Sequence, residues 1–227
     1  MFTLAFDTTT NFCSISLFKN TEKQDVYTSE LTFGQSEELI VQIQNMLHTH
    51  NLSIQDLSLM AVCTGPGSFT GVRSSIAAAR AFALTNKNMI LSGISAFEAY
   101  LFSLDTLQIQ DCVAVIVETK REDFYVAYYD ANCHKIGAPK TAFFEDIVRD
   151  LQNKHITVIG DGAQRFLSKN TGLHIHQAVF DTHPPVDKLA LAAIHRFENG
   201  TTDFPKPLYL KAADICAKKK KNWNFFS

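Results

Sequence analysis

The sequence has no long apolar run: stretches such as residues 113–117 fall far short of the ~20 residues that a helix needs to cross a bilayer. Residues 1–6 have no cationic start and lead directly into Asp7, which is not typical of a signal peptide. The five cysteines are scattered and include no Cys-x-x-Cys pair, so they suit a reducing compartment and offer no zinc pattern. We therefore expect a cytoplasmic protein without a membrane span.

The composition is that of an ordinary globular protein, because 46% of the residues are hydrophobic and 19% are charged. This excludes intrinsic disorder and collagen-like fibres, and 227 residues suffice for a sizeable core. The formal net charge of −2 hides an asymmetry: residues 206–227 contain six lysines and one acid, which is +5, so the rest of the chain carries −7. The C-terminal tail is therefore an electrostatically separate segment.

Hydrophobic patterns predict one order of elements twice, βββαβαβα. The first copy has strands at residues 2–6, 12–18, 25–31, 59–64 and 89–93 and helices at 36–50, 70–85 and 95–103. The second has strands at 112–118, 124–129, near 135, 156–160 and 173–180 and helices at 143–153, 163–168 and 186–199. We interpret these copies as duplicated α/β subdomains, residues 1–105 and 106–205, followed by the tail. This is the topology of the actin-like ATPase (ASKHA, ribonuclease H-like) fold.

The loop between the strand at 59–64 and the helix at 70–85 has readable chemistry. Pro66 presets the second position of a turn, and Gly67 can supply the positive φ that a type II turn needs next. Ser68 or Thr70 can cap the helix, and Gly71 allows a close approach. The loop matches neither a Walker sequence nor a dinucleotide fingerprint. From these residues alone it can be a structural turn, an anion site or a partner surface.

The run Gly65-Pro66-Gly67-Ser68-Phe69-Thr70-Gly71-Val72-Arg73, followed by an alanine-rich helix, resembles the TsaB (YeaZ) family. Further landmarks lie at residues 4–10, 35–39, 93–95 and 207–210, with weaker ones at 118–125 and 160–162. The resemblance implies an actin-like fold that is used without catalysis. It also implies a role beside TsaD, the transferase that attaches threonylcarbamoyl to the adenosine next to the anticodon in tRNA.

The same resemblance implies the partners. It predicts a heterodimer with TsaD, a homodimer when the chain is alone, TsaE and TsaC as the other components of the pathway, and contact with tRNA only through the complex. Helices at two positions pair with TsaD in the family, so we predict that the interface residues are Leu39, Ile43, Met46, Ala77, Arg80 and Ala81. The alternative is that the apolar stripes of the predicted helices at 36–50 and 70–85 both cover the protein's own sheet.

Actin-like ATPases hold phosphates in two hairpins, with an acid in each that helps to bind hydrated magnesium. Here Asp7 is followed by Thr8 rather than glycine, and no glycine follows Glu118, so we expect a degenerate nucleotide site. For Asp7, a cap on its own turn through Thr9 or Thr10 is favoured over magnesium binding. We therefore predict no catalytic residues and no cofactor or metal of its own, with ATP and metal on TsaD.

Other chemistries have less support. The chain lacks the His-x-x-x-His pair through which the TsaD relatives bind metal, and no Gly-x-Ser-x-Gly elbow supports a peptidase. A small actin-like ATPase or metabolite kinase is the alternative function. Residues 218–227 combine four lysines with three aromatics, which suits phosphate contacts and base stacking, but a solvated terminus is the favoured interpretation of such a segment.

Overall fold

The structure is a computed structural model that describes residues 1–32, 34–104, 109–169 and 171–210. In the first half lie β1 (Phe2–Asp7), β2 (Phe12–Lys19), β3 (Glu22–Glu30), α1 (Gln35–Thr49), a short 3-10 helix (Ile54–Asp56), β4 (Leu57–Cys63), α2 (Phe69–Thr85), β5 (Ile90–Ile94) and α3 (Ala96–Leu101). In the second half lie β6 (Cys112–Glu118), β7 (Phe124–Asp130), β8 (Lys135–Ala142), α4 (Phe144–Leu151), β9 (His155–Gly160), α5 (Ala163–Leu167), β10 (His174–Phe180) and α6 (Val186–Glu198). The predicted order βββαβαβα is therefore confirmed in both halves. Within the described ranges, no helix has the length and apolar character to cross a membrane.

Each half forms one five-stranded sheet, and the two sheets have the same topology. The strand orders are β3-β2-β1-β4-β5 and β8-β7-β6-β9-β10. In each, the first three strands are antiparallel, and the two that follow a helix run parallel to the central strand. The central strand β6 is buried on both faces, as its unbroken apolar run predicts.

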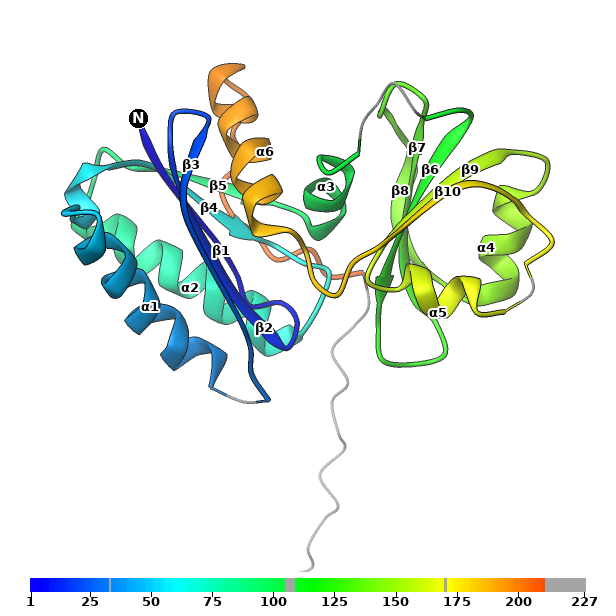
Figure 1. Cartoon of the computed structure of the whole chain (residues 1–227), viewed down its shortest axis with the longest axis horizontal. Helices are drawn as coiled ribbons and strands as arrows, with labels where there is room; N and C mark the ends of the chain where they lie inside the picture. The colour runs from blue at the N-terminus through cyan, green and yellow to red at the C-terminus, as the bar shows by residue number, and fades with distance from the viewer. Residues whose placement is uncertain (33, 105–108, 170, 211–227) are drawn as a thin grey trace, which may run out of the picture.

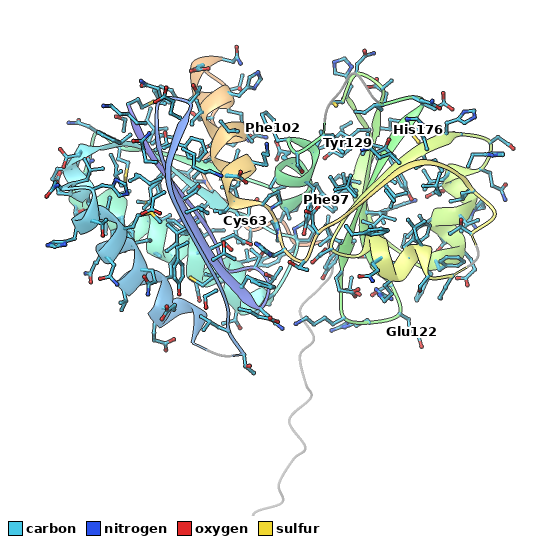
Figure 2. All side chains as sticks on the ribbon, in the orientation of Figure 1. Cys63, Phe97, Phe102, Glu122, Tyr129 and His176 are labelled. Atoms are coloured by element: carbon cyan, nitrogen blue, oxygen red, sulfur yellow. The ribbon has the colours of Figure 1, made fainter. Side chains whose placement is uncertain are left out.

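Helices fill three layers around the two sheets (Figure 1). Helices α1 and α2 cover the outer face of the first sheet, and α4 and α5 cover the outer face of the second. Between the sheets lie α3 and α6, whose side chains share one core with β1, β4 and β6. Phe97 of α3 is fully buried in this central layer (Figure 2).

The two middle helices each contact the sheet of the other half. Helix α6 was expected in the subdomain 106–205, but it packs on β1, β2, β4 and β5 of the first sheet, while α3 contacts β6 and β9. The alanines of α6 at positions 190, 192 and 193 are buried, and small side chains let a helix fit between two sheets. The predicted boundary at residue 105 therefore separates the sheets but not the helices that pack on them.

The chain after α6 returns to the first half. Gly93 N–H donates to the Asp203 carbonyl over 2.8 Å, and Leu208 N–H donates to the Thr64 carbonyl over 2.8 Å. This segment thus satisfies one exposed backbone group of edge strand β5, at Gly93, and one of Thr64, the residue after β4. The predicted tail, residues 206–227, is described only up to residue 210, and its lysine-rich part lies outside the described residues.

Candidate functional site

A cleft of about 1030 Å³ lies between the two halves. Its walls come from the β1–β2 turn, the loop before α2, the β6–β7 turn, the start of α5, the chain after β10 and residues 208–210. The two degenerate hairpins predicted from Asp7 and Glu118 therefore belong to one cleft. Whether this cleft keeps the chemistry of a nucleotide site depends on what its polar groups already bind.

In the first hairpin, Asp7 ends β1 and is completely buried. Its Oδ1 accepts a hydrogen bond from Thr9 N–H over 2.8 Å, so the predicted cap on the turn is confirmed. Burial raises the pKa of Asp7 to about 6. The next side chain points inward as well, because Thr8 Oγ1 donates to the Gly71 carbonyl over 2.9 Å and is 2.7 Å from Ser75 Oγ. The first hairpin is bound to α2.

The loop before α2 departs from the predicted type II turn. The positive φ, +92°, belongs to Gly65, which precedes a cis peptide bond to Pro66, and not to Gly67. Glycine is needed at position 67 for space instead, since a Cβ there would lie 2.5 Å from the Thr9 carbonyl oxygen. Ser68 caps α2 by accepting from Gly71 N–H over 3.3 Å, which confirms one of the two predicted caps.

The close approach predicted at Gly71 is made by the chain itself. A Cβ at Gly71 would lie 1.9 Å from the Thr8 carbonyl oxygen, and Ser68 N–H donates to the Thr9 carbonyl over 2.7 Å. The inner side of the loop is therefore a structural turn that seats against the first hairpin. Its outer side is different, because Phe69, Thr70 and the following Arg73 are exposed.

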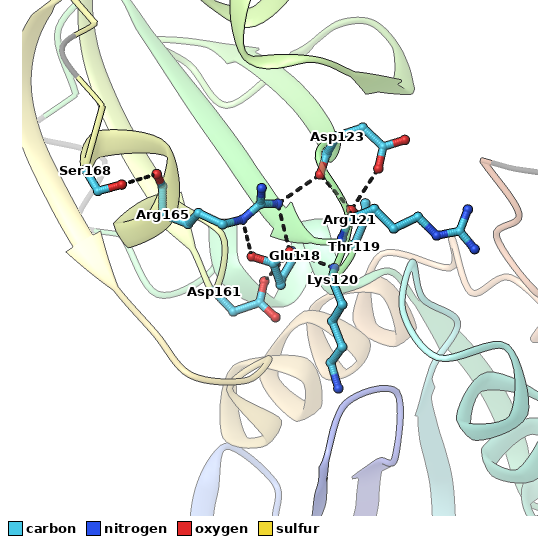
Figure 3. Close-up of polar contacts among 8 residues, drawn as sticks. All are labelled: Glu118, Thr119, Lys120, Arg121, Asp123, Asp161, Arg165 and Ser168. Carbon is cyan, nitrogen blue, oxygen red and sulfur yellow. Dashed lines mark hydrogen bonds and ion pairs between the residues drawn. The ribbon is translucent and has the colours of Figure 1, made fainter.

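In the second hairpin, Glu118 is engaged in a bidentate ion pair (Figure 3). Arg165 Nε donates to Oε2 over 2.7 Å and Nη2 donates to Oε1 over 2.8 Å. Lys120 N–H donates to Oε1 as well, over 2.7 Å. The Arg165 guanidinium is itself held 3.7 Å from the centre of the Phe124 ring. Both carboxylate oxygens of Glu118 are therefore used inside the protein.

Asp161 supports the same hairpin from the loop after β9. Its Oδ1 accepts from Glu118 N–H over 2.9 Å, and burial together with the Glu118 charge raises the pKa of Asp161 to about 7. Lys120 extends toward the first hairpin (Figure 3), where Nζ donates to Asn11 Oδ1 over 2.7 Å. This contact joins the two hairpins across the cleft.

The carboxylates of both hairpins are engaged by the protein's own groups. Asp7 is buried beneath its turn, where its Oδ2 has no hydrogen-bond partner among the described residues, and both oxygens of Glu118 accept from Arg165 or Lys120. The side chain of Thr8 stands where a phosphate-binding glycine is usual and is tied to α2. In the part of the chain that the structure describes, no group of three His, Cys, Asp or Glu side chains is arranged to hold a metal ion.

The predicted interface residues are buried on α1 but exposed on α2. Leu39, Ile43 and Met46 of α1 are at most 5% exposed and belong to the core under the first sheet. Their prediction as partner contacts is corrected, because this stripe covers the protein's own sheet. The three residues predicted on α2 are exposed, namely Ala77, Arg80 and Ala81.

Sequence reasoning missed several surface and cleft residues. Val41 of α1 is 50% exposed and Leu84 of α2 is 81% exposed, although both are apolar. An apolar residue that falls off the buried stripe of a helix is the signal that could have identified them. Arg165 was also missed, and its only signal is a lone arginine just after Gly160-Asp161-Gly162.

Comparisons with known proteins identify the relatives of this chain. Residues 34–148, just over half of the chain, match the family model described as "TsaD: tRNA N6-adenosine threonylcarbamoyltransferase". The Escherichia coli (strain K12) protein named tRNA threonylcarbamoyladenosine biosynthesis protein TsaB is 25% identical over 220 residues, which cover 92% of this chain and 94% of that protein. A Bacillus subtilis (strain 168) protein of the same name is 24% identical over 174 residues, covering 75% and 72%.

Among solved structures, YeaZ from Pseudomonas aeruginosa superposes with a TM-score of 0.78 at 18% identity and covers 92% of this chain and 99% of its own. The predicted actin-like fold class is thereby confirmed. The loop at residues 65–73, the relatives and the shared fold lead to one assignment. The chain belongs to the TsaB (YeaZ) family, in the group of proteins that the TsaD model describes.

Proposed function

We propose that this chain is a non-catalytic, activating subunit for the formation of N6-threonylcarbamoyladenosine on tRNA, and that it acts by pairing with the transferase TsaD. The observation that carries the proposal is the exposed face of α2. Ala77, Ala81 and Leu84 lie there without a covering element in the described chain, beside α1 with its exposed Val41. A strip of small and apolar side chains allows another helix to approach closely.

The non-catalytic part of the proposal is supported by the cleft. Glu118 accepts hydrogen bonds from Arg165 and Lys120, and Thr8 binds Gly71, so the two hairpins serve to hold the protein's own elements. ATP and metal are accordingly proposed to belong to TsaD. The chain then contributes a surface that favours one conformation of its partner.

The proposal includes the remaining partners. TsaE and TsaC act in the same pathway, and in the absence of TsaD the exposed face of α2 pairs with a second copy of the chain. Contact with tRNA occurs only in the complex, because the chain outside residues 206–227 carries a net charge of −7, which repels a polyanion.

Isothermal titration of the chain with its cognate TsaD, with and without ATP, tests this function. We expect a complex that Ala81→Glu abolishes, since a carboxylate would be buried in an apolar contact. Ala138→Glu, at an exposed position on β8, is the matched control and should bind normally. Formation of the modified nucleoside by the reconstituted system should follow the same pattern.

The opposite result would identify the alternative, a small actin-like ATPase or metabolite kinase. In that case the chain alone would turn over ATP, and Asp7→Asn or Glu118→Gln would abolish turnover. Absence of a complex with TsaD together with such turnover would overturn the proposed function.

A further inference from the structure

Two arginines on α2 are held in the same way beside the cleft, whose lining includes Phe69 and Tyr209. Arg73 and Arg80 are seven residues apart, which is two helical turns, so they lie on one face about 10 Å apart along the axis. Both are exposed. Ala77 and Ala81 lie on the same side of the helix.

Arg73 is held by two aromatic rings. Its guanidinium carbon lies 3.6 Å from the centre of the Phe69 ring and 5.8 Å from that of Tyr209. Nε donates to the Tyr209 hydroxyl over 2.8 Å. The two rings are 5.5 Å apart between centroids. Stacking and a single hydrogen bond therefore fix the direction of this side chain.

Arg80 is held in the same way one step further along. Its guanidinium carbon lies 5.1 Å from the centre of the Phe204 ring, and Nη2 donates to the Pro205 carbonyl over 2.9 Å. Because Arg80 meets residues 204 and 205 while Arg73 meets residue 209, this segment runs along α2 in the opposite direction. The segment and the helix together make a composite surface, which we name the arginine–aromatic face: Phe69, Arg73, Arg80, Phe204 and Tyr209.

Neither arginine of this face has an acidic partner among the residues that the structure describes, whereas Arg149 and Arg165 each have one and Arg196 has two. A guanidinium has five N–H groups, and the intramolecular contacts of Arg73 and Arg80 each use one. The aromatic rings orient the remaining N–H groups, and no described carboxylate neutralises the two positive charges. A surface that covers them must supply acceptors, or it would bury two unpaired charges.

We propose that the arginine–aromatic face binds a protein surface with two acidic side chains about 10 Å apart, which flank a small apolar strip that packs on Ala77 and Ala81. This inference rests on the proposed function and names the chemistry by which the partner recognises the chain. Carboxylates accept two parallel hydrogen bonds from a guanidinium, which gives direction as well as charge. A nucleic acid is the less suitable occupant, because the strip between the arginines is apolar and the chain outside the tail is acidic.

The test measures binding of purified TsaD to the full chain at low and moderate salt. For the double variant Arg73→Gln with Arg80→Gln, we expect affinity about 10- to 100-fold weaker at low salt and a reduced dependence of affinity on salt. Arg149→Gln, an exposed arginine on α4 with its own partner Asp146, is the matched control and should leave both values unchanged. Tyr209→Phe, which keeps the ring and removes the hydroxyl, should produce a smaller loss.

The outcomes separate this inference from the proposed function. If Ala81→Glu abolishes the complex while the arginine variant binds TsaD with unchanged affinity and salt dependence, the inference is wrong and the proposed function stands. If neither substitution weakens binding, both are wrong. If the arginine variant instead loses binding of tRNA by the chain alone, in a gel-shift assay, and keeps TsaD, the face serves RNA and the inference is overturned.

A rescue experiment gives a second, independent readout. Arg80→Glu should weaken the complex, and exchanging one acidic residue for arginine at the partner's contact surface should restore it. Arg80→Glu also removes the hydrogen bond to the Pro205 carbonyl, so a thermal melt accompanies the binding measurement to show that the variant is folded. Failure of every acid-to-arginine exchange on that partner surface to restore binding would contradict the predicted carboxylate contacts.

Discussion

Substitution of Gly71 by alanine tests how closely the loop at residues 65–73 packs against the first hairpin, because two effects of opposite sign on stability act at this position. Gly71 lies within α2, where alanine is intrinsically more stable than glycine by about 0.5–1 kcal/mol. However, the added methyl group would lie 1.9 Å from the Thr8 carbonyl oxygen and 2.9 Å from its carbon. Real contacts of this kind are longer by about 1 Å or more, so the hairpin and the helix must separate.

The magnitude follows from what that separation breaks. The hydrogen bonds Thr8 Oγ1 to the Gly71 carbonyl and Ser68 N–H to the Thr9 carbonyl span the same contact. Each contributes about 1 kcal/mol, and overpacking adds roughly 1–3 kcal/mol. After the gain in helix propensity, we expect Gly71→Ala to lower the free energy of unfolding by about 2–4 kcal/mol. For a chain of this size that lowers Tm by roughly 4–16 °C.

Urea denaturation followed by circular dichroism gives the free energy, and a thermal melt gives Tm. Gly137→Ala is the control, since nothing lies within 4 Å of that position and only its positive φ of +73° opposes alanine. It should cost about 1–2 kcal/mol. If Gly71→Ala is as stable as the unaltered chain, or more stable, the gain in helix propensity outweighs the steric cost, and the close approach that we describe is wrong.

Three further predictions concern the cleft and α1. The folded-state pKa of Asp161, about 7, lies above its ordinary value of 3.8, so the contribution of Asp161 to stability falls as pH rises between these values. In urea titrations, Asp161→Asn should therefore gain stability relative to the unaltered chain from pH 5 to pH 8. A difference in stability that stays constant with pH would contradict this. Arg165→Gln leaves Glu118 without its bidentate partner and should cost about 1–3 kcal/mol, with non-additive loss in a double-mutant cycle with Glu118→Gln; full additivity would refute the pairing. On α1, Ile43→Ala should lower the free energy of unfolding by about 2–5 kcal/mol because Ile43 is buried. Val41→Glu should change it by no more than about 0.5 kcal/mol and should weaken the complex with TsaD. Equal stabilities of the two variants would show that we have assigned the wrong side of α1 to the core.

The order of elements was predictable because its signals are local. A strand buried on both faces, such as β6, shows an unbroken apolar run, and an Asp followed by threonines forms its own turn, as Asp7 does with Thr9. Each of these depends on residues within a few positions of one another. The loop was identified for the same reason, although its positive φ belongs to Gly65 and not to Gly67.

The site was less predictable because its contacts join distant residues. Arg165 and Glu118 are 47 residues apart, Thr8 and Gly71 are 63 apart, and the contact between Lys120 and Asn11 spans 109. No short pattern records such distances. The stripe on α1 was also ambiguous, since a periodic apolar face shows that one side of a helix is covered without showing whether its own sheet or a partner covers it.

The amino-acid sequence by itself determined that this chain folds as two copies of one α/β unit and that the turns after Asp7 and Glu118 contain no glycine, because backbone preferences and hydrophobic periodicity act over a few residues. Tertiary structure alone decided that α6 packs on the first sheet, that Glu118 is bound by Arg165, and that two stacked arginines face outward from α2. Those outcomes depend on which surfaces meet when the two halves close around a shared core. That choice is made by packing and charge between residues far apart in the chain.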